Sequence, residues 1–272
     1  MDGFLEYFEQ MPTYYKLGWI IFCLAIFWIV EAGTPLIKLD YKKWRHALVN
    51  LSFLAAIILI NVLFGIFFLA ADQFAQPREF GILFYIDLPI IVELLIAFMV
   101  FDLVSQYFAH YLLHKVKPLW KLHIVHHSDT KVDATTGTRN HPLEFVLRET
   151  FALIVLTLLG APIAFYLFYR ICTIFFTYFT HANISLPQWL DRSLSYVFIT
   201  PNMHKFHHHF ERPWTDTNFG NIFSFWDRIF GTLVYDETNK IKYGLDVLDD
   251  EDDEKIGYLF KLPWNKNVKT DY

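Results

Sequence analysis

Four long apolar stretches are the feature that most constrains the fold of this chain. They cover residues 17–37, 47–71, 88–109 and 151–180. Each is close to or longer than the ~20 residues that a helix needs to cross the hydrocarbon core of a bilayer. The packed core of a soluble protein explains one such run but not four, and aromatic residues make up 19% of the chain. The sequence therefore predicts an all-α, polytopic membrane protein.

The fourth stretch is interrupted by Gly160, Ala161 and Pro162. As one straight helix, its roughly 30 residues would rise ~45 Å and carry His181 to the far side of the membrane. Proline is disfavoured inside a helix and glycine weakens one, so we expect a break at this point. Residues 151–159 and 163–180 then form a re-entrant helical hairpin that returns the chain to the side from which it came.

The first three apolar stretches are expected to be transmembrane helices, and basic residues indicate their orientation. The connection over residues 38–45 carries four basic residues, whereas the connection over residues 72–87 carries only Arg78. Because cytoplasmic loops are enriched in lysine and arginine, the first connection should lie in the cytoplasm. The N-terminus should then lie outside, with the histidine-rich segment and the C-terminus cytoplasmic.

Eleven of the twelve histidines lie between His110 and His209. Eight of them form three boxes, which are His110-x3-His114, His123-x2-His126-His127 and His204-x2-His207-His208. On a helix, positions i, i+3 and i+4 share a face, so each box presents several imidazoles in one direction. A structural zinc ion takes four ligands, and a facial-triad iron takes two histidines and a carboxylate. Eight histidines therefore indicate two ions.

Three classes of chemistry are compatible with such boxes in a membrane protein. These are an oxygen-dependent oxidoreductase, a zinc-dependent membrane lipid hydrolase and a metal transporter. Transport is the weakest, because ion pathways place polar residues near the middle of the bilayer, whereas these boxes follow the ends of the spans. The sequence contains no His-Glu-x-x-His protease motif and no Gly-x-Gly dinucleotide loop, so redox equivalents must come from a separate protein. The charge balance of the sequence does not show the basic character that is typical of a nucleic-acid-binding protein.

The boxes and the segments around them resemble the fatty acid hydroxylase and sterol desaturase superfamily of integral-membrane di-iron enzymes. The resemblance extends from about residue 101 to residue 232. Besides the boxes, it rests on Arg139-Asn-His141-Pro142-Leu-Glu144, Thr180-His181-Ala-Asn183, Asn218-Phe-Gly220 and Trp226-Asp227-Arg-Ile-Phe230-Gly231-Thr232. We accordingly divide the chain into transmembrane helices (residues 1–100), a histidine-box catalytic domain (residues 101–235) and a polar, acidic C-terminal tail (residues 236–272).

The resemblance implies an enzyme that uses dioxygen to hydroxylate or desaturate a lipid C–H bond. The substrate would be of the sterol, fatty acyl, alkylglycerol or carotenoid type. The cofactors would be two iron ions, which zinc can replace in overexpressed or purified protein. Electrons would come from a separate donor of the cytochrome b5, ferredoxin or reductase type.

The resemblance also implies the metal ligands. They are the eight box histidines and His181, with His141 either a further ligand or a hydrogen-bond partner of one. Some related hydroxylases carry another histidine four residues after the position of His181, where this chain has Ser185. Beyond the ligands no catalytic residue is expected, and His46 and His209 should be structural or face solvent.

Two aspartates are expected to support the site without binding metal. Asp102 lies two turns before His110 in the third apolar stretch, where a carboxylate is costly unless it has a partner. It either orients a ligand histidine or pairs with another polar group. Asp227 is expected to form an ion pair with Arg228, or a cap, that holds the C-terminal lobe against the site.

Overall fold

The computed structural model describes residues 2–236, 241–245, 247–248 and 253–268. Throughout these residues the secondary structure is helical, apart from isolated β-bridges between Pro35 and Ile184 and between Phe198 and Phe223. The long helices are α1 Asp2–Glu9, α2 Thr13–Gly33, α3 Lys43–Ala75, α4 Ile90–Phe101, α7 Pro142–Leu159 and α8 Ile163–His181. The shorter ones are α5 Ala109–Lys115, α6 Lys117–His127, α9 Gln188–Leu194, α10 Pro201–His207, α11 Phe225–Ile229 and α12 Ile256–Lys261. The all-α prediction is confirmed.

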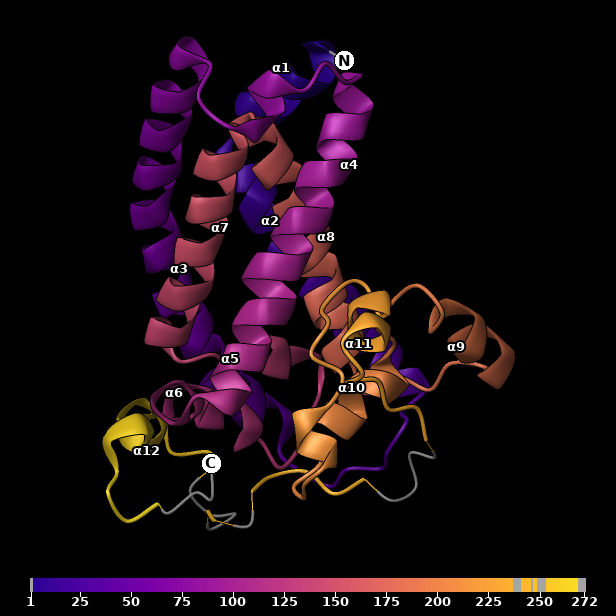
Figure 1. Ribbon diagram of the computed structural model, residues 1–272. Coiled ribbons are helices and arrows are strands. Elements are labelled where there is room, and N and C mark those ends of the chain that lie inside the picture. The colour runs from indigo at the N-terminus through magenta and orange to yellow at the C-terminus, as the bar shows by residue number, and fades with distance from the viewer. Residues whose placement is uncertain (1, 237–240, 246, 249–252, 269–272) are drawn as a thin grey trace.

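Five helices form an upright bundle, and the short helices gather at one end of it. In Figure 1, α2, α3, α4, α7 and α8 run the height of the bundle, with α1 across the top and α5, α6, α10 and α12 below. Four helical segments are long and apolar enough to cross a membrane, namely Thr13–Gly33, Lys43–Tyr85, Ile90–Lys115 and Ile163–His181. They match the four apolar stretches of the sequence.

The outer surface of the bundle is itself apolar. On α3, Leu59, Val62 and Ile66 are each more than half exposed. Large apolar side chains exposed in this density on one face are typical of a surface that contacts lipid. Inside, aromatic residues such as Phe101, which is fully buried, pack α4 against α7 and α8.

The break in the fourth apolar stretch is confirmed. Helix α7 ends at Leu159, and Gly160 adopts a left-handed conformation with φ 66°. The amide of Gly160 donates to the Leu156 carbonyl at 3.0 Å, and Pro162 is the N-cap of α8. Glycine is suited to this position because it has no Cβ to clash. A Cβ at Gly160 would also lie 2.3 Å from the carbonyl oxygen of Phe80, in the loop that follows α3.

The first arm of this hairpin is longer than the sequence suggested. Helix α7 begins at Pro142 instead of residue 151, because the His141 side chain caps it and proline is favoured in a first turn. The nine added residues include Glu144, Arg148 and Glu149, which point into the bundle and find partners there. In Figure 1, α7 and α8 therefore both run over most of the height of the bundle.

A π-helical segment, Asp102–Phe108, joins α4 to α5. The apolar periodicity of the sequence gave no sign of it. Each π turn adds a residue to the helical repeat and so rotates the face that the following helix presents. The segment lies directly before His110, and it therefore sets the direction in which the histidines of α5 point.

The C-terminal segment covers the lower end of the bundle. Leu259 of α12 and Leu262 pack against Phe53 of α3 and Trp120 of α6. The acidic stretch at residues 249–252 lies outside the described residues. Next to it, Asp253 is buried and accepts a hydrogen bond from the hydroxyl of Thr130.

Cysteine labelling tests the arrangement of the hairpin in a membrane. In a protein without its two native cysteines, we expect single cysteines at Lys42, Lys131 and Lys266 to react with an impermeant maleimide from the cytosolic side. A cysteine at Glu79 should react only from the opposite side. Lys131 and Lys266 flank the hairpin, so labelling of these two positions from opposite sides would contradict the topology.

Substitution of Gly160 tests the turn itself. We expect Gly160→Ala to lower the midpoint of thermal unfolding in detergent, because a left-handed conformation costs a residue with a Cβ about 1–2 kcal/mol and because the Cβ meets Phe80. Gly18→Ala is the matched control, since a Cβ on this α2 residue meets nothing within 4 Å. Equal unfolding midpoints for the two variants would show that the turn does not require glycine.

Candidate metal centre

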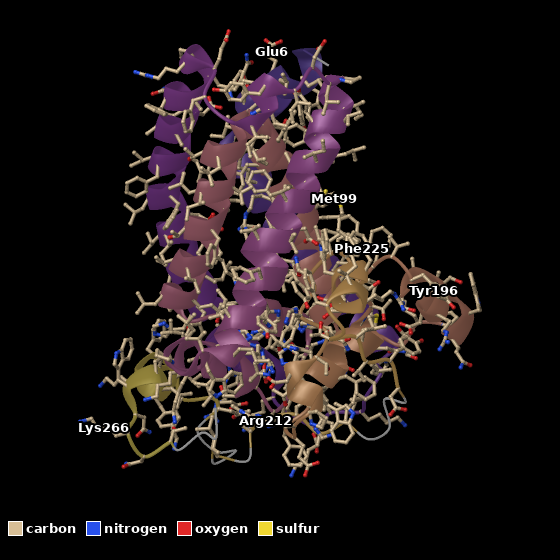
Figure 2. All side chains as sticks on the ribbon, in the orientation of Figure 1. Glu6, Met99, Tyr196, Arg212, Phe225 and Lys266 are labelled. Carbon is tan, nitrogen blue, oxygen red and sulfur yellow. The ribbon has the colours of Figure 1, made fainter. Side chains whose placement is uncertain are left out.

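Nine histidines form two buried clusters at the lower end of the bundle. In each cluster, one ring nitrogen from every member lies within 4.8 Å of the others. The first cluster contains His110, His114, His123, His127 and His207, and the second contains His126, His181, His204 and His208. Figure 2 shows nitrogen-rich side chains gathered where the bundle meets α6 and α10. Both clusters are able to hold a metal ion.

Helices α6 and α10 each contribute to both clusters. Consecutive residues on a helix point about 100° apart, so the neighbours His126 and His127 cannot face the same point. His127 joins the first cluster and His126 the second. The same division separates His207 from His208 at the end of α10. The doubled histidines therefore place the two clusters side by side.

Hydrogen bonds on the outer side of the rings fix how the imidazoles are protonated. The Nδ1 atoms of His110, His181 and His207 lie 2.7–2.8 Å from the backbone carbonyls of Phe219, Thr177 and Thr217 respectively. A carbonyl oxygen can only accept, so each Nδ1 carries the proton. In a neutral ring the Nε2 atom then presents a lone pair toward the inside of the cluster.

Pairs of Nε2 atoms approach each other closely in both clusters. The distance is 3.0 Å between His110 and His123, and 3.1 Å between His126 and His181. The Nδ1 atoms of all four rings face acceptors, so neither Nε2 of a pair has a proton to share. Two lone pairs that face each other repel unless a cation lies between them. The donor set therefore fits metal ions, for which neutral imidazole nitrogen is a common ligand.

Burial keeps these rings neutral. It is the main cause that lowers the pKa of His126 to about 4 and that of His207 to about 3, with neighbouring charged groups as smaller contributions. Burial, followed by the neighbouring imidazoles, also holds the pKa of His208 well below its usual range. Neither ring nitrogen of His208 has a hydrogen-bond partner within the described part of the chain. Unpartnered buried polar atoms are rare, and a metal ligand is a role that accounts for them.

Carboxylates hold the clusters from outside. Glu144 on α7 accepts a hydrogen bond from Nδ1 of His123 at 2.9 Å and two from Arg148 at 3.0 and 3.1 Å. Asp216 lies 3.3 Å from Nδ1 of His114. Neither carboxylate was identified from the sequence as part of the site. Glu144 belongs to one of the motifs that carry the family resemblance, which was the available signal for it.

Asp102 and Asp227, which the sequence suggested as supports of the site, form their hydrogen bonds with groups other than the cluster histidines. Asp227 accepts hydrogen bonds from the amides of Phe219 and Gly220 at 2.8 and 3.0 Å, and so holds the loop whose Phe219 carbonyl binds His110. Arg228 donates to the Ser195 carbonyl at 2.8 Å. Asp102 accepts from the indole of Trp226 at 3.0 Å, which makes it a partner of another polar group.

Three histidines lie outside both clusters. The Nδ1 atom of His141 accepts from the amide of Leu143 at 3.2 Å and caps α7. His209 accepts from the Glu211 amide at 3.0 Å and stacks on Trp214. His46 is buried on α3, and carboxylates face both of its ring nitrogens.

The carboxylates around His46 belong to Asp129 and Asp133, which hold the segment that follows α6. Asp129 accepts from His46 at 2.9 Å and lies 3.9 Å from Arg139. Burial alone would raise the pKa of Asp129, but these two groups hold it well below its usual range. The Arg139 carbonyl in turn lies 3.2 Å from Nδ1 of His126, so the network ends at the second cluster.

A cavity of about 710 Å³ opens onto the metal centre. At one end it is lined by four cluster histidines, which are His110, His126, His181 and His204. From there it extends between α2, α3, α7 and α8, past apolar residues such as Ile57, Phe64 and Phe68. The space is long, largely apolar and within the part of the bundle that is apolar enough for a membrane.

Comparison with known proteins agrees with this site. The family model for fatty acid hydroxylases matches residues 94–232, about half of the chain, and includes every cluster histidine. The ornithine lipid hydroxylase OlsE of Rhizobium tropici is 32% identical over 127 residues, which are 47% of this chain and 38% of the relative. The alkylglycerol monooxygenase of Homo sapiens is 28% identical over 148 residues, which are 52% of this chain and 30% of the relative.

The alkylglycerol monooxygenase of Danio rerio is similar at 27% identity over 155 residues, 55% of this chain and 32% of the relative. The chain thus aligns with less than two fifths of the length of these relatives. No solved structure matches it. The resemblance to membrane hydroxylases that the histidine boxes indicated is confirmed, and the chain belongs to the fatty acid hydroxylase family.

Proposed function

We propose that this chain is a membrane-bound di-iron oxidoreductase that uses dioxygen to hydroxylate a C–H bond of a lipid. One observation carries the proposal above all, which is that an apolar cavity within the membrane-spanning bundle ends at two buried histidine clusters. The names of the relatives describe a lipid hydroxylase and a monooxygenase of alkylglycerols, and these agree with a substrate that enters from the bilayer.

The ligands in this proposal are the nine cluster histidines, five for one ion and four for the other. His141 is left out, because its Nδ1 accepts a backbone hydrogen bond in the cap of α7. Iron suits a site of neutral imidazoles, and it would supply the activation of dioxygen. Zinc in the same positions would instead favour hydrolysis, and desaturation would remove two hydrogens without adding oxygen. Metal and product analysis separate these possibilities.

The chain itself contributes orientation and exclusion of water. Backbone carbonyls and Glu144 accept from Nδ1 of five cluster histidines, namely His110, His123, His126, His181 and His207. These five rings are held in one tautomer with Nε2 directed inward before any metal binds. The surrounding side chains close the site, because every cluster histidine is at most 6% exposed. Hydroxylation with dioxygen consumes two electrons and two protons and releases water. With no dinucleotide motif in the chain, the electrons would come from a separate donor protein.

We further propose that the metal centre and the C-terminus face the cytoplasm and the N-terminus the opposite side. The four basic residues at positions 38–45 lie in the connection after α2 and in the first turn of α3, at the same end of the bundle as the clusters. The positive-inside bias supports this orientation. Residues 101–235 would form the catalytic domain, and the preceding helices α2 and α3 would share the cavity wall with α7 and α8.

Metal analysis tests the ligand assignment. We expect the protein from iron-replete cells to bind about two metal ions per chain, a number that follows from the capacity of the two clusters. His126→Ala and His207→Ala should each reduce the metal content, because each removes a ligand from one cluster. His141→Ala should retain both ions. A folded sample of His126→Ala with a full complement of metal would refute the assignment.

Turnover tests the reaction. We expect a host that expresses the chain to accumulate a hydroxylated lipid that requires iron and dioxygen, with product analysis by mass spectrometry and ¹⁸O₂ labelling. His207→Ala should abolish the product, whereas the matched control His209→Ala should retain it, because His209 lies outside both clusters. A hydroxylated product that carries no ¹⁸O from ¹⁸O₂ would contradict oxygenation, and cleavage of a lipid by the zinc-loaded protein would instead indicate a hydrolase.

A further inference from the structure

An arginine lines the wall of the cavity within the apolar part of the bundle. Arg170 is on α8, eleven residues before His181. At a rise of 1.5 Å per residue, these two positions lie ~16 Å apart along the helix axis. Ionisable residues at membrane depth are costly, face the interior of a bundle or a cavity and generally have a functional role. The metal clusters do not explain why Arg170 is here, since its contacts are elsewhere.

Two neighbours fix the position of its guanidinium. The Nη1 atom lies 3.3 Å from Oε1 of Glu149 on α7, and the Tyr166 hydroxyl donates to the other oxygen of that carboxylate. The guanidinium also lies over the ring of Phe145, 5.6 Å from its centroid. Cation–π contact and ion pairing together hold a flexible side chain in one place. The arrangement is thus rigid before any ligand arrives.

Most hydrogen-bond donors of Arg170 remain available. A guanidinium has five N–H donors, and among the residues that the structure describes only Glu149 accepts from or pairs with this one. Its side chain keeps 18% of its surface exposed and borders the cavity. Arg148 is different, because its donors go to Glu144 and to Gln106 at 3.2 Å. Arg148 supports a metal ligand, whereas Arg170 borders the cavity and pairs with no carboxylate but Glu149 among the described residues.

We propose that Arg170 binds the polar group of the lipid substrate through an oxygen acceptor, such as a carboxylate or an ester carbonyl. This rests on the proposed lipid oxygenation. The guanidinium only donates hydrogen bonds, so its partner must supply oxygen lone pairs. An apolar chain alone would offer these donors no acceptor, and an unpaired donor that a ligand removes from water is unfavourable. Binding at Arg170 would set how far along the substrate the C–H bond at the clusters lies, and Arg170 is therefore a specificity-determining residue.

Binding by the unaltered protein gives the first test. Metal-loaded protein in dodecyl maltoside is titrated with tritiated hexadecanoate, and methyl hexadecanoate and hexadecane compete at defined micellar mole fractions. The three probes have the same sixteen-carbon chain and differ in whether they carry oxygen atoms that can accept a hydrogen bond. We expect hexadecanoate and methyl hexadecanoate each to bind at least about tenfold more tightly than hexadecane. A tenfold difference in affinity corresponds to ~1.4 kcal/mol. Equal binding of all three probes would overturn the proposal.

Variants of Arg170 give the second test. Arg170→Met should remove the tenfold preference for acceptor-bearing chains, and Arg170→Lys should retain part of it. Because loss of Arg170 alone leaves Glu149 buried and unpaired, the double variant Glu149→Gln with Arg170→Met serves if the single variant does not fold. Arg78→Met is the matched control, since Arg78 also contacts a phenylalanine ring but lies outside the cavity wall. A preference that persists in a folded Arg170→Met or double variant would refute the assignment.

The role of Arg170 and the proposed lipid hydroxylation can fail independently in these experiments. Binding is measured without turnover, so a preference that depends on Arg170 would support the assignment even if no lipid is oxidised. Conversely, a protein that hydroxylates lipid but binds all three probes equally would retain the proposed function and lose the role of Arg170. When product is formed, Arg170→Met should also broaden the distribution of hydroxylated positions, whereas Arg78→Met should leave it unchanged.

Discussion

The structure depends on keeping nine imidazoles buried, neutral and directed at one another. Without a cation, such a group has no favourable arrangement in an apolar interior, because its Nε2 lone pairs repel at about 3 Å and its Nδ1 protons need acceptors. The acceptors are mostly backbone carbonyls, those of Thr177, Thr217 and Phe219 among them. The Thr177 carbonyl is held by helix α8, whereas those of Thr217 and Phe219 stay in place only if their loop does. The path of the loops around α10 is therefore fixed by the metal centre as much as by packing.

Buried carboxylates elsewhere are explained by the same requirement. Asp227 touches no histidine, yet it holds the amides of Phe219 and Gly220 and so places the acceptor of His110. Asp129 and His46 act in the same way on the segment that ends at Arg139, the acceptor of His126. A charge in the protein interior is costly unless paired. Here each pairing fixes a loop on which the orientation of an imidazole depends.

The sequence predicted those features that depend on local composition. The apolar stretches, the break at Gly160 and the grouping of the histidines follow from helix length, backbone conformation and helical periodicity, and the structure contains all of them. The apolar pattern did not reveal the early start of α7, because the added turns contain the charged residues Glu144 and Glu149, although Pro142 is a local signal for a helix start. Nor did periodicity reveal the π-helical segment Asp102–Phe108, or that His46 is held by residues more than 80 positions away. The partners of His46 come from distant segments, which a local pattern does not contain.

Helix α7 carries residues that support both the metal centre and Arg170, the proposed substrate anchor. Its first three turns carry Glu144, Arg148 and Glu149, and the rest of the helix is almost entirely apolar. Glu144 and Arg148 form an i,i+4 pair beside His123, whereas Glu149 turns toward Arg170 on α8. Consecutive residues on a helix point in different directions, and here the result is that Arg148 belongs to the metal centre and Glu149 to the cavity wall. A shift of α7 would move the support of a cluster histidine and the partner of Arg170 together. Because Arg170 and the cluster histidine His181 are both on α8, and the glutamate partners of Arg170 and His123 are both on α7, the distance between the metal centre and the proposed anchor is set by two helices and not by loops.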